Sequence, residues 1–556
     1  MAIVSKPFGP QQRNTALERL ATERFDVLVI GGGVVGCGIA LDAATRGLSV
    51  ALVEAQDFAA GTSSRSSKLI HGGLRYLEQL DFSLVREALQ ERTLILTELA
   101  PHLAQPVPMV FPLKHRFWER PYVGAGVALY DLMGGRRGVP NHTHLTRRAA
   151  LRLMPGLSKR ALIGGIHFYD GQVDDARHTL MIARTAAQHG ATCVTRARAT
   201  SLLREGERVT GAIVSDTQTG QEIRVDAKHV INATGVWTKE IEKTFGLSSS
   251  LSVRTSKGVH ILVPRDRIDA QSGIIARTEK SVLFVIPWDN HWLIGTTDTE
   301  WELDLEQPTA TSTDIDYILD HVNQLVTNKL TRADIVGVFA GLRPLISGSA
   351  SSTTKLSREH AVISPAPGFT AIAGGKYTTY RVMAKDAVDA ALASGRGMQP
   401  RSISSRVRLL GADGFQELWE SRESLAAAHN LSTAQIEHLL RRFGTVVLEV
   451  LATIQAEPEL REPLSGAPMY LKAEITYAVT HEGAIHLEDV LMRRTRISID
   501  TSDRGVIAAR EVAELMSQVL HWSDAERESE IARYIEAIAA ERRAQQQLTD
   551  EAALRA

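Results

Sequence analysis

Cysteine is scarce in this sequence, with only Cys37 and Cys193 among 556 residues. Two cysteines cannot build a disulfide framework, a four-cysteine zinc site or an iron–sulfur cluster, and they fit a reducing compartment. An excess of positive charge is also missing, because 63 lysines and arginines face 64 acidic residues. This balance argues against a general nucleic-acid binder, whose phosphate contacts need a basic surplus.

Long apolar runs are missing too. No stretch reaches the roughly 18–20 uncharged apolar residues of a membrane-spanning helix, and the N-terminal segment lacks the apolar core of a secretory signal. We therefore expect a cytoplasmic protein whose contact with a membrane, if any, is peripheral. Hydrophobic residues make up 44% of the chain and charged residues 23%, which is typical of a globular protein, and the length predicts two to four domains.

The first informative pattern begins at Phe25. A β-rich run (FDVLVI) is followed by a glycine loop (GGGVVGCG), a helix-like segment and a second β-rich run (LSVALVE). Gly31, Gly33 and Gly36 form a G-x-G-x-x-G motif, and Glu54 ends the second run. These glycines permit a tight turn and a close approach of a pyrophosphate to a helix N-terminus, while the carboxylate accepts a hydrogen bond from a ribose hydroxyl. This order of strand, glycine loop, helix, strand and acidic residue predicts a dinucleotide site. The negative charge of Glu54 disfavours the 2′-phosphate of NADP.

The segment that follows, GTSSRSSKLIHGG at residues 61–73, combines hydroxyl side chains with glycines. The serines can donate hydrogen bonds to a ligand, and the two final glycines let the backbone approach a planar ring. The cofactor-binding residues expected in this segment are Ser63, Ser64, Ser67, Lys68, Leu69 and His71.

Longer strings carry a resemblance to a known family. They include SSKLIHGGLRYLE, VDDAR, VINATGVW, KGVHILVP, DIVGVFAGLRPL and GGKYTTYR, with a weaker match at THEGAIHLEDVLMRRTR. On these strings the sequence resembles the FAD-dependent glycerol-3-phosphate dehydrogenase family, within the larger group similar to D-amino-acid oxidase. The resemblance identifies the expected dinucleotide as FAD, and it leaves the residues beyond about 505 unmatched.

The resemblance also implies an α/β fold. It consists of a Rossmann-like FAD-binding domain, an α+β substrate domain with an antiparallel sheet, and a C-terminal helical domain. We expect a polar N-terminal arm at 1–23, an FAD-binding domain at about 24–100, 166–250 and 335–400, a substrate domain at about 101–165 and 251–334, and the helical domain at 401–556.

The activity implied by the resemblance is oxidation of sn-glycerol 3-phosphate to dihydroxyacetone phosphate by hydride transfer to FAD, with electrons passed to a membrane quinone. Three alternatives stay open: an oxidase that uses oxygen and produces hydrogen peroxide, a related flavoprotein with a carboxylate substrate, and a non-catalytic flavin-binding protein. The cationic residues after position 340 argue against the last of these, because a binding module needs no clamp beside the flavin.

A phosphorylated substrate needs directional cationic donors, because a dianion that leaves water must be paired. The substrate-binding residues expected within the matched strings are Arg75, Tyr76, Arg343, Arg358 and Lys376, and Arg358 is the preferred phosphate ligand.

The predicted catalytic residues are His71, Arg343 and Lys376. A neutral histidine has a pKa suited to accepting the proton of the substrate hydroxyl, although His71 could equally make a structural contact with the flavin. Arg343 could stabilise the developing negative charge on the substrate oxygen. Lys376 precedes a predicted helix, where positive charge favours a reduced flavin. The remaining expected cofactor contacts are Gly235, Gly374, Gly375, Thr378 and Thr379.

The segment at residues 111–137 mixes aromatic and basic side chains. These are Phe117, Trp118, Tyr122, Lys114, Arg116, Arg120, Arg136 and Arg137. The mixture suits an anionic membrane surface at the inner face of the cell membrane, and it fits equally well an ordinary helix of the substrate domain.

No metal site is expected, because His142 and His144 in NHTH have no acidic or cysteine set nearby in the sequence. A stripe of Ile531, Tyr534, Ile535 and Ile538 in the C-terminal region packs either on its own domain or on a second subunit, so a homodimer is one expectation. Capping boxes predict helix starts at Ser432 and Ser523.

Overall fold

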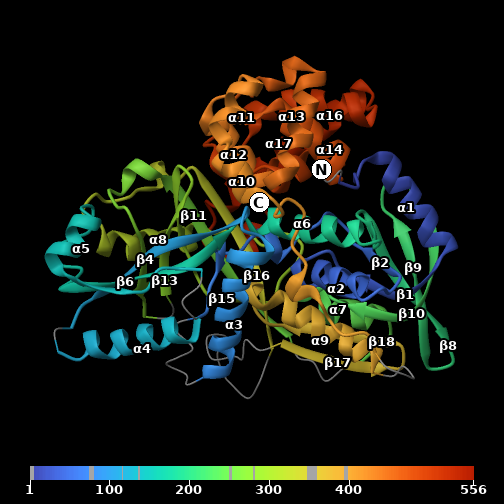
Figure 1. Ribbon diagram of the computed structural model, residues 1–556, viewed down its shortest axis with the longest axis horizontal. Helices are drawn as coiled ribbons and strands as arrows, with labels where there is room; N and C mark the ends of the chain where they lie inside the picture. The colour runs from blue at the N-terminus through green and yellow to red at the C-terminus, as the bar shows by residue number, and fades with distance from the viewer. Residues whose placement is uncertain are drawn as a thin grey trace.

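The computed structural model describes residues 5–73, 81–115, 117–134, 138–248, 253–279, 282–346, 360–393 and 399–556. Two lobes, each built on a β-sheet, lie side by side, and a helical domain sits over both (Figure 1). Several residues singled out in the sequence lie outside the described residues: Arg75, Tyr76, Arg116, Arg136, Arg137 and Arg358.

The first sheet has the strand order β17-β18-β10-β1-β2-β7, with β8 and β9 paired beyond β10. Its strands are β1 Arg24–Ile30, β2 Val50–Val53, β7 Thr192–Val194, β8 Ala197–Glu205, β9 Arg208–Asp216, β10 Glu222–Asn232, β17 His360–Ala366 and β18 Phe369–Gly374. β7, β2, β1, β10 and β18 are parallel. The apolar runs of β1 and β2 are almost fully buried, as central parallel strands require.

Helices α2 (Val34–Thr45), α6 (Asp175–Gln188) and α9 (Tyr380–Leu392) pack together beside this sheet. The expected Rossmann-like lobe is therefore confirmed. The predicted N-terminal arm contains helix α1 (Pro10–Thr22), which lies against β7 and β10 and buries Leu20 completely. A short helix, α7 (Thr238–Thr244), follows β10.

The second sheet has the strand order β15-β11-β14-β13-β12-β4-β6-β3, with β16 paired to β11 and β5 paired to β6. Its strands are β3 Leu69–Ile70, β4 Ala104–Leu113, β5 Thr143–Thr146, β6 Gly164–Val173, β11 Val253–Pro264, β12 Gly273–Arg277, β13 Val282–Trp288, β14 His291–Gly295, β15 Thr299–Trp301 and β16 Gly337–Ile346. All its pairs are antiparallel except β4 with β12. The helices of this lobe are α3 Phe82–Leu94, α4 Glu119–Gly134, α5 Arg147–Leu153 and α8 Ser312–Leu325.

The boundary between the lobes differs from the expected one. Strands β3, β6 and β16 fall in segments that we assigned to the FAD-binding domain, yet all three belong to the second sheet. β16 pairs with β11 over ten positions, from Val253 opposite Ile346 to Leu262 opposite Gly337. Pairing between strands so far apart in sequence leaves no local signal, so the strand run at 337–346 could not be assigned to a sheet beforehand.

The helical domain spans residues 401–556. Its helices are α10 Phe415–Glu420, α11 Arg422–His429, α12 Thr433–Phe443, α13 Val447–Ala456, α14 Lys472–Glu482, α15 Ile497–Asp500, α16 Val506–Leu520, α17 Asp524–Ala544 and α18 Asp550–Leu554, with a small hairpin of β19 Pro463–Leu464 and β20 Ala467–Leu471. Capping boxes at Ser432 and Ser523 are present as predicted. In the predicted stripe, Ile531, Tyr534 and Ile538 are buried inside the domain, so covering them needs no second subunit, whereas Ile535 is 39% exposed.

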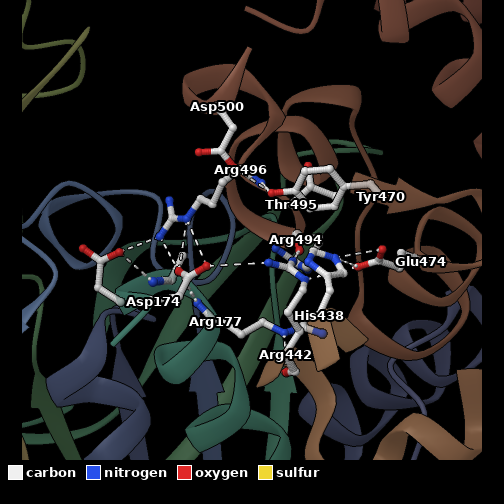
Figure 2. Close-up of polar contacts among 12 residues, drawn as sticks. Asp174, Arg177, His438, Arg442, Tyr470, Glu474, Arg494, Thr495, Arg496 and Asp500 are labelled. Atoms are coloured by element: carbon white, nitrogen blue, oxygen red, sulfur yellow. Dashed lines mark hydrogen bonds and ion pairs between the residues drawn. The ribbon is translucent and has the colours of Figure 1, made fainter. Parts of the chain in front are cut away.

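Buried ion pairs join the helical domain to the first lobe. Arg494 donates to both carboxylate oxygens of Asp57 at 2.7 Å, and both side chains are 1% exposed. Arg496 contacts Asp174 and Asp175 at 2.5 Å each, at the start of α6 (Figure 2). Asp57 follows β2, so these pairs reach the segment that leads from the first sheet to residues 61–73. We call this set the junction.

A second group of polar side chains supports the junction from within the helical domain. Arg442 and His438 both contact Glu474, at 3.2 Å in each case (Figure 2). Asp500 accepts a hydrogen bond from the Tyr470 hydroxyl at 2.8 Å, and burial raises the pKa of Asp500 to about 7. Asp500 therefore titrates near neutral pH, whereas the carboxylates of the junction are paired with arginines.

We predict that Asp57→Ala strongly destabilises the protein. Removing this carboxylate leaves the buried guanidinium of Arg494 without its main partner, and breaking one side of a buried pair costs about 3–5 kcal/mol. Chemical unfolding followed by circular dichroism measures the loss. The matched control is Arg510→Ala, which removes an exposed ion pair with Glu528 and should leave the unfolding midpoint nearly unchanged. Equal midpoints for the two variants would contradict the prediction.

Candidate active site

A cavity of about 640 Å³ lies where the two sheets meet. The first sheet contributes the loops after β1, β2, β10 and β18, and the second sheet contributes β11 and β16. Ligand sites in open α/β sheets form at the carboxyl ends of parallel strands. A cavity of this size matches a cofactor together with a small substrate.

The glycine loop forms one wall of the cavity. Gly31 and Gly33 line it, and Gly31 has a φ of +109°, a conformation that L side chains rarely adopt. Gly36 does not line the cavity; a Cβ there would overlap the carbonyl oxygen of Gly31, so this glycine lets α2 pack against the loop. The backbone N–H of Val34, at the start of α2, donates to Oγ of Ser63 at 3.0 Å.

Glu54 lines the cavity at the end of β2. Its two carboxylate oxygens accept hydrogen bonds from the backbone N–H groups of Gly32 at 2.6 Å and Gln56 at 2.7 Å. Burial raises the pKa of Glu54. Each carboxylate oxygen can accept more than one hydrogen bond, so the residue can still receive a ribose hydroxyl while it holds the glycine loop in place.

Segment 61–73 divides between two environments. Ser63, Ser67, Leu69 and His71 line the cavity as expected. Ser64 and Lys68 do not line the cavity, which differs from the expectation. The Lys68 side chain turns toward the junction instead, where its ammonium donates to the Ser64 carbonyl at 2.6 Å and to Asp175 at 2.7 Å. The Ser64 hydroxyl donates to the Gly61 carbonyl at 3.4 Å.

Lys68 is fully buried, and burial together with the positive charge of Arg496 lowers its pKa to about 8. The ion pair with Asp175 opposes this shift. A lysine held in this way between a backbone carbonyl and a carboxylate fixes the path of the segment; it does not present its charge to the cavity.

The same cavity also contains the residues predicted for chemistry. His71, Arg343 and Lys376 all line it, as do Gly235, Gly374 and Gly375. Thr378 and Thr379 are not among the lining residues. Thr378 acts on His71, because its hydroxyl accepts from the His71 N–H at 3.0 Å and donates to the His71 carbonyl at 3.2 Å.

Arg343 enters the cavity from β16 and is held in a fixed orientation. Its Nη2 donates to Oγ1 of Thr296 at 2.7 Å, and both terminal nitrogens approach the Thr297 carbonyl at 3.3 Å. The Asp298 carboxylate lies 3.5 Å away. A Cβ at Gly258 on β11 would overlap the guanidinium, so a larger residue there would displace Arg343 from this position. The arrangement directs a permanent positive charge to one point of the cavity.

His260 is a cavity residue that the sequence reasoning missed. It lies on β11, is 2% exposed, and stacks on Phe339 with ring centroids 5.0 Å apart. Its Nε2 is 2.8 Å from Oγ of Ser67, while Nδ1 has no hydrogen-bond partner among the described residues. Burial and the nearby charges of Arg343 and Lys68 hold its pKa well below the usual value, so the ring is neutral. The only sign of this residue in the sequence was a single histidine within the apolar string KGVHILVP.

The histidines of NHTH have an acidic neighbour after all. The imidazole Nδ1 of His142 lies 2.6 Å from the carboxylate of Asp131. Across the described parts of the chain, however, no group of three or more metal-binding side chains comes together.

Comparisons with known proteins identify two family models that match the chain: FAD dependent oxidoreductase over residues 26–381, and the C-terminal domain of alpha-glycerophosphate oxidase over residues 402–527. The glycerol-3-phosphate dehydrogenase of Mycobacterium leprae (strain TN) is 56% identical over 542 residues, covering 98% of this chain and 93% of that protein. The mitochondrial glycerol-3-phosphate dehydrogenase of Homo sapiens is 36% identical over 554 residues, covering 95% and 75%.

Solved structures agree with these matches. The glycerol-3-phosphate dehydrogenase from Bacillus halodurans complexed with FAD superposes with a TM-score of 0.79 at 29% identity, covering 96% of this chain and 97% of that chain. The L-alpha-glycerophosphate oxidase from Mycoplasma pneumoniae with FAD bound has a TM-score of 0.55 at 19% identity, covering 68% and 98%, and shows the shared fold alone. The cavity suits FAD, because the glycine loop and Glu54 form its wall beside β1 and β2 while His71, Arg343 and Lys376 line the same cavity.

We predict that Gly36→Ala abolishes FAD binding. The added methyl group would overlap the Gly31 carbonyl and force α2 away from the loop. The measurement is the amount of flavin absorbance retained per chain after gel filtration. Gly126→Ala, at an open position in α4, is the control and should retain full flavin. Full flavin content in the Gly36 variant would rule out this role for the third glycine.

Proposed function

Because this chain belongs to the FAD-dependent glycerol-3-phosphate dehydrogenase family, we propose that it oxidises sn-glycerol 3-phosphate to dihydroxyacetone phosphate and passes the electrons to a membrane quinone. The observation that carries the proposal is the single cavity that joins a dinucleotide cradle at Gly31 and Glu54 to a cationic end at Arg343 and Lys376. The M. leprae relative, which is named a glycerol-3-phosphate dehydrogenase, supports the substrate.

When bound, FAD supplies the hydride acceptor of this reaction. The chain's own residues bind the substrate, orient it and take its proton. Arg343 has the rigid, permanently charged group needed to hold the substrate oxygen at C2 as negative charge develops there. Lys376 follows two left-handed glycines, Gly374 and Gly375, and adds a second positive charge to the lining of the cavity. The phosphate contacts predicted for Arg75, Tyr76 and Arg358 stay predictions.

The proton of the C2 hydroxyl needs a neutral base within the cavity. His71 is the first candidate, because Thr378 fixes its backbone on both sides and its ring lines the cavity. His260 is the second candidate, because burial keeps it neutral and its Nδ1 has no hydrogen-bond partner among the described residues. A base that stays neutral across the operating range can accept a proton without first losing one.

The quinone acceptor is supported by the surface around α4. Phe117 and Trp118 directly precede the helix, and Tyr122 lies in its first turn. Their exposed fractions are 86%, 51% and 52%, and Leu132 near the other end of α4 is 79% exposed. Aromatic and apolar side chains on one helix favour the interfacial region of a bilayer. Within the described residues, no helix has the length and apolar character to cross a membrane.

The Arg120 side chain, which we expected at the membrane surface, instead bonds to the protein backbone. Its Nη2 donates to the Leu145 carbonyl at 2.8 Å, so this arginine ties α4 to β5. We therefore assign the proposed membrane contact to Phe117, Trp118, Tyr122 and Leu132. The proposed location is the inner face of the cell membrane, with peripheral attachment.

We predict that replacing the base slows reduction of the flavin by glycerol 3-phosphate by about 100-fold or more, since general-base catalysis contributes at least that factor. His71→Asn and His260→Asn are compared by stopped-flow measurement of flavin bleaching across substrate concentrations. The variant that loses rate at saturation identifies the base. If both variants keep the rate constant of the unaltered protein, neither histidine is the base; if the unaltered protein is not bleached at all, the proposed substrate is wrong.

We predict that the reduced protein transfers electrons to a quinone analogue much faster than to oxygen. We also predict that the double variant Phe117→Glu with Trp118→Glu binds phosphatidylglycerol vesicles at least about tenfold more weakly, because each aromatic side chain loses its burial in the bilayer. Flotation with vesicles and quinone-dependent turnover measure the two effects, and flavin reduction by substrate should stay unchanged.

The matched control for the membrane contact is Ile507→Glu, a change at a 61% exposed apolar position in the helical domain. It should bind vesicles as the unaltered protein does. Vesicle binding that is equally weak in both variants would remove α4 from the proposal. Stoichiometric peroxide formed in air at the best quinone rate would establish the oxidase alternative instead.

A further inference from the structure

The last residues of the chain, 545–556, cross from the helical domain to the second sheet. We call them the tail segment. Both family models stop before it, at residues 381 and 527. The C-terminus nevertheless lies near the centre of the molecule, beneath the helical domain and beside β11 and β16 (Figure 1). Chain ends without contacts lie at the surface, so specific contacts must hold the tail segment in this position.

Backbone hydrogen bonds attach the tail segment to the start of α8. The N–H of Ser312 donates to the Gln547 carbonyl at 2.8 Å, and the Thr313 hydroxyl donates to the Leu548 carbonyl at 2.8 Å. A third link lies just before the tail segment, where Arg504 pairs with Glu541 of α17 at 2.6 Å. The tail segment is thus held at both the helical domain and the second lobe.

A buried lysine provides the charged anchor. Lys257 on β11 is 1% exposed, and its ammonium contacts Asp314 at 2.6 Å and also Asp550 of α18. The same ammonium lies 5.4 Å from the ring centroid of Trp301. Because Asp314 alone would neutralise Lys257, the second carboxylate is not needed to compensate the buried charge. Its effect is to fix α18 beside Trp301.

An apolar contact completes the attachment. Leu554 packs into a small cluster with Trp301, Leu303 and Leu305, whose other members, Val236, Trp237 and Leu342, also line the cavity. Trp301 donates from Nε1 to the Asp304 carbonyl at 3.0 Å. The tail segment therefore braces residues 301–306 through this cluster.

The braced residues form part of the cavity beside Glu54. Asp304 and Glu306 line the cavity, and the Glu306 carboxylate lies 3.7 Å from the Arg198 guanidinium. Arg198 follows Ala197, whose N–H donates to the Glu54 carbonyl at 2.8 Å. Glu54 is at the position that receives the ribose in dinucleotide sites of this kind. Residues 301–306 thus lie at the wall of the cavity next to Arg198, which is in the strand that follows the contact with Glu54.

We propose that the tail segment is a strap that holds residues 301–306 over the adenosine end of the cavity and thereby slows the release of FAD. Asp550 and Leu554 are its positioning residues: neither touches the cavity, and both act through Trp301 and its neighbours. The strap concerns retention of the cofactor, so it does not depend on which substrate or electron acceptor the enzyme uses.

The test measures FAD dissociation directly, from the recovery of free flavin fluorescence after dilution of the holoprotein. A chain that ends at residue 546 should release FAD at least about tenfold faster, because loss of apolar contacts at a closed site appears mainly in the dissociation rate. Leu554→Ala and Asp550→Asn should each accelerate release by a smaller factor, and Leu554→Met should restore the slow rate.

The matched control is Leu548→Ala, since this side chain is 73% exposed and contributes only its carbonyl oxygen to the attachment. It should release FAD at the rate of the unaltered protein. Circular dichroism of each variant checks that the helical domain is folded, and the two point variants carry the test if the shortened chain does not fold. Unchanged FAD release in Leu554→Ala and Asp550→Asn would overturn the strap.

Discussion

The need to pair buried charge at the junction constrains the rest of this structure. Asp57, Asp174 and Asp175 come from the first lobe, and Arg494 and Arg496 come from the helical domain. A buried ion pair adds little net stability over an apolar contact, but leaving one member unpaired is costly. The pairs therefore matter less as a source of energy than as a constraint, because few arrangements of the lobes and the helical domain satisfy all of them together.

This constraint extends to the cavity through segment 61–73. Lys68 is bound to Asp175 on the junction side, and its neighbours Ser67 and Leu69 line the cavity on the other. Lys68 also has a positive φ, of 59°, which places successive residues on different sides of the segment. The position of His71 in the cavity is thus set partly by arginines more than four hundred residues later in the chain.

Features that depend on neighbouring residues were predictable from the sequence, because all the residues that form them lie in one short stretch of chain. The glycine motif and the capping boxes at Ser432 and Ser523 each depend on residues a few positions apart, and Glu54 follows Gly36 by 18 residues within one strand–helix–strand unit. The family resemblance correctly predicted the three-part fold. The expected positions of Ser64 and Lys68 differ from the observed ones. The Lys68 ammonium pairs with Asp175 on α6, and the Ser64 carbonyl accepts from Lys68 and from Arg496 in the string MRRTR, and no spacing rule connects those positions. Asp174 does cap α6 locally through the Arg177 N–H, yet its carboxylate also pairs with Arg496, 322 residues away.

The helical domain contributes none of the described residues that line the cavity, and yet it supports the cavity at two places. The junction holds segment 61–73, which carries His71, and the tail segment packs against residues 301–306, which lie at the wall of the cavity next to Arg198. These two contacts reach the cavity from different elements, one through β2 and α6 and the other through β11 and β15. Because both belong to one folded unit, a shift of the helical domain would alter both parts of the cavity together. A domain without a catalytic residue can in this way determine how the cofactor is held.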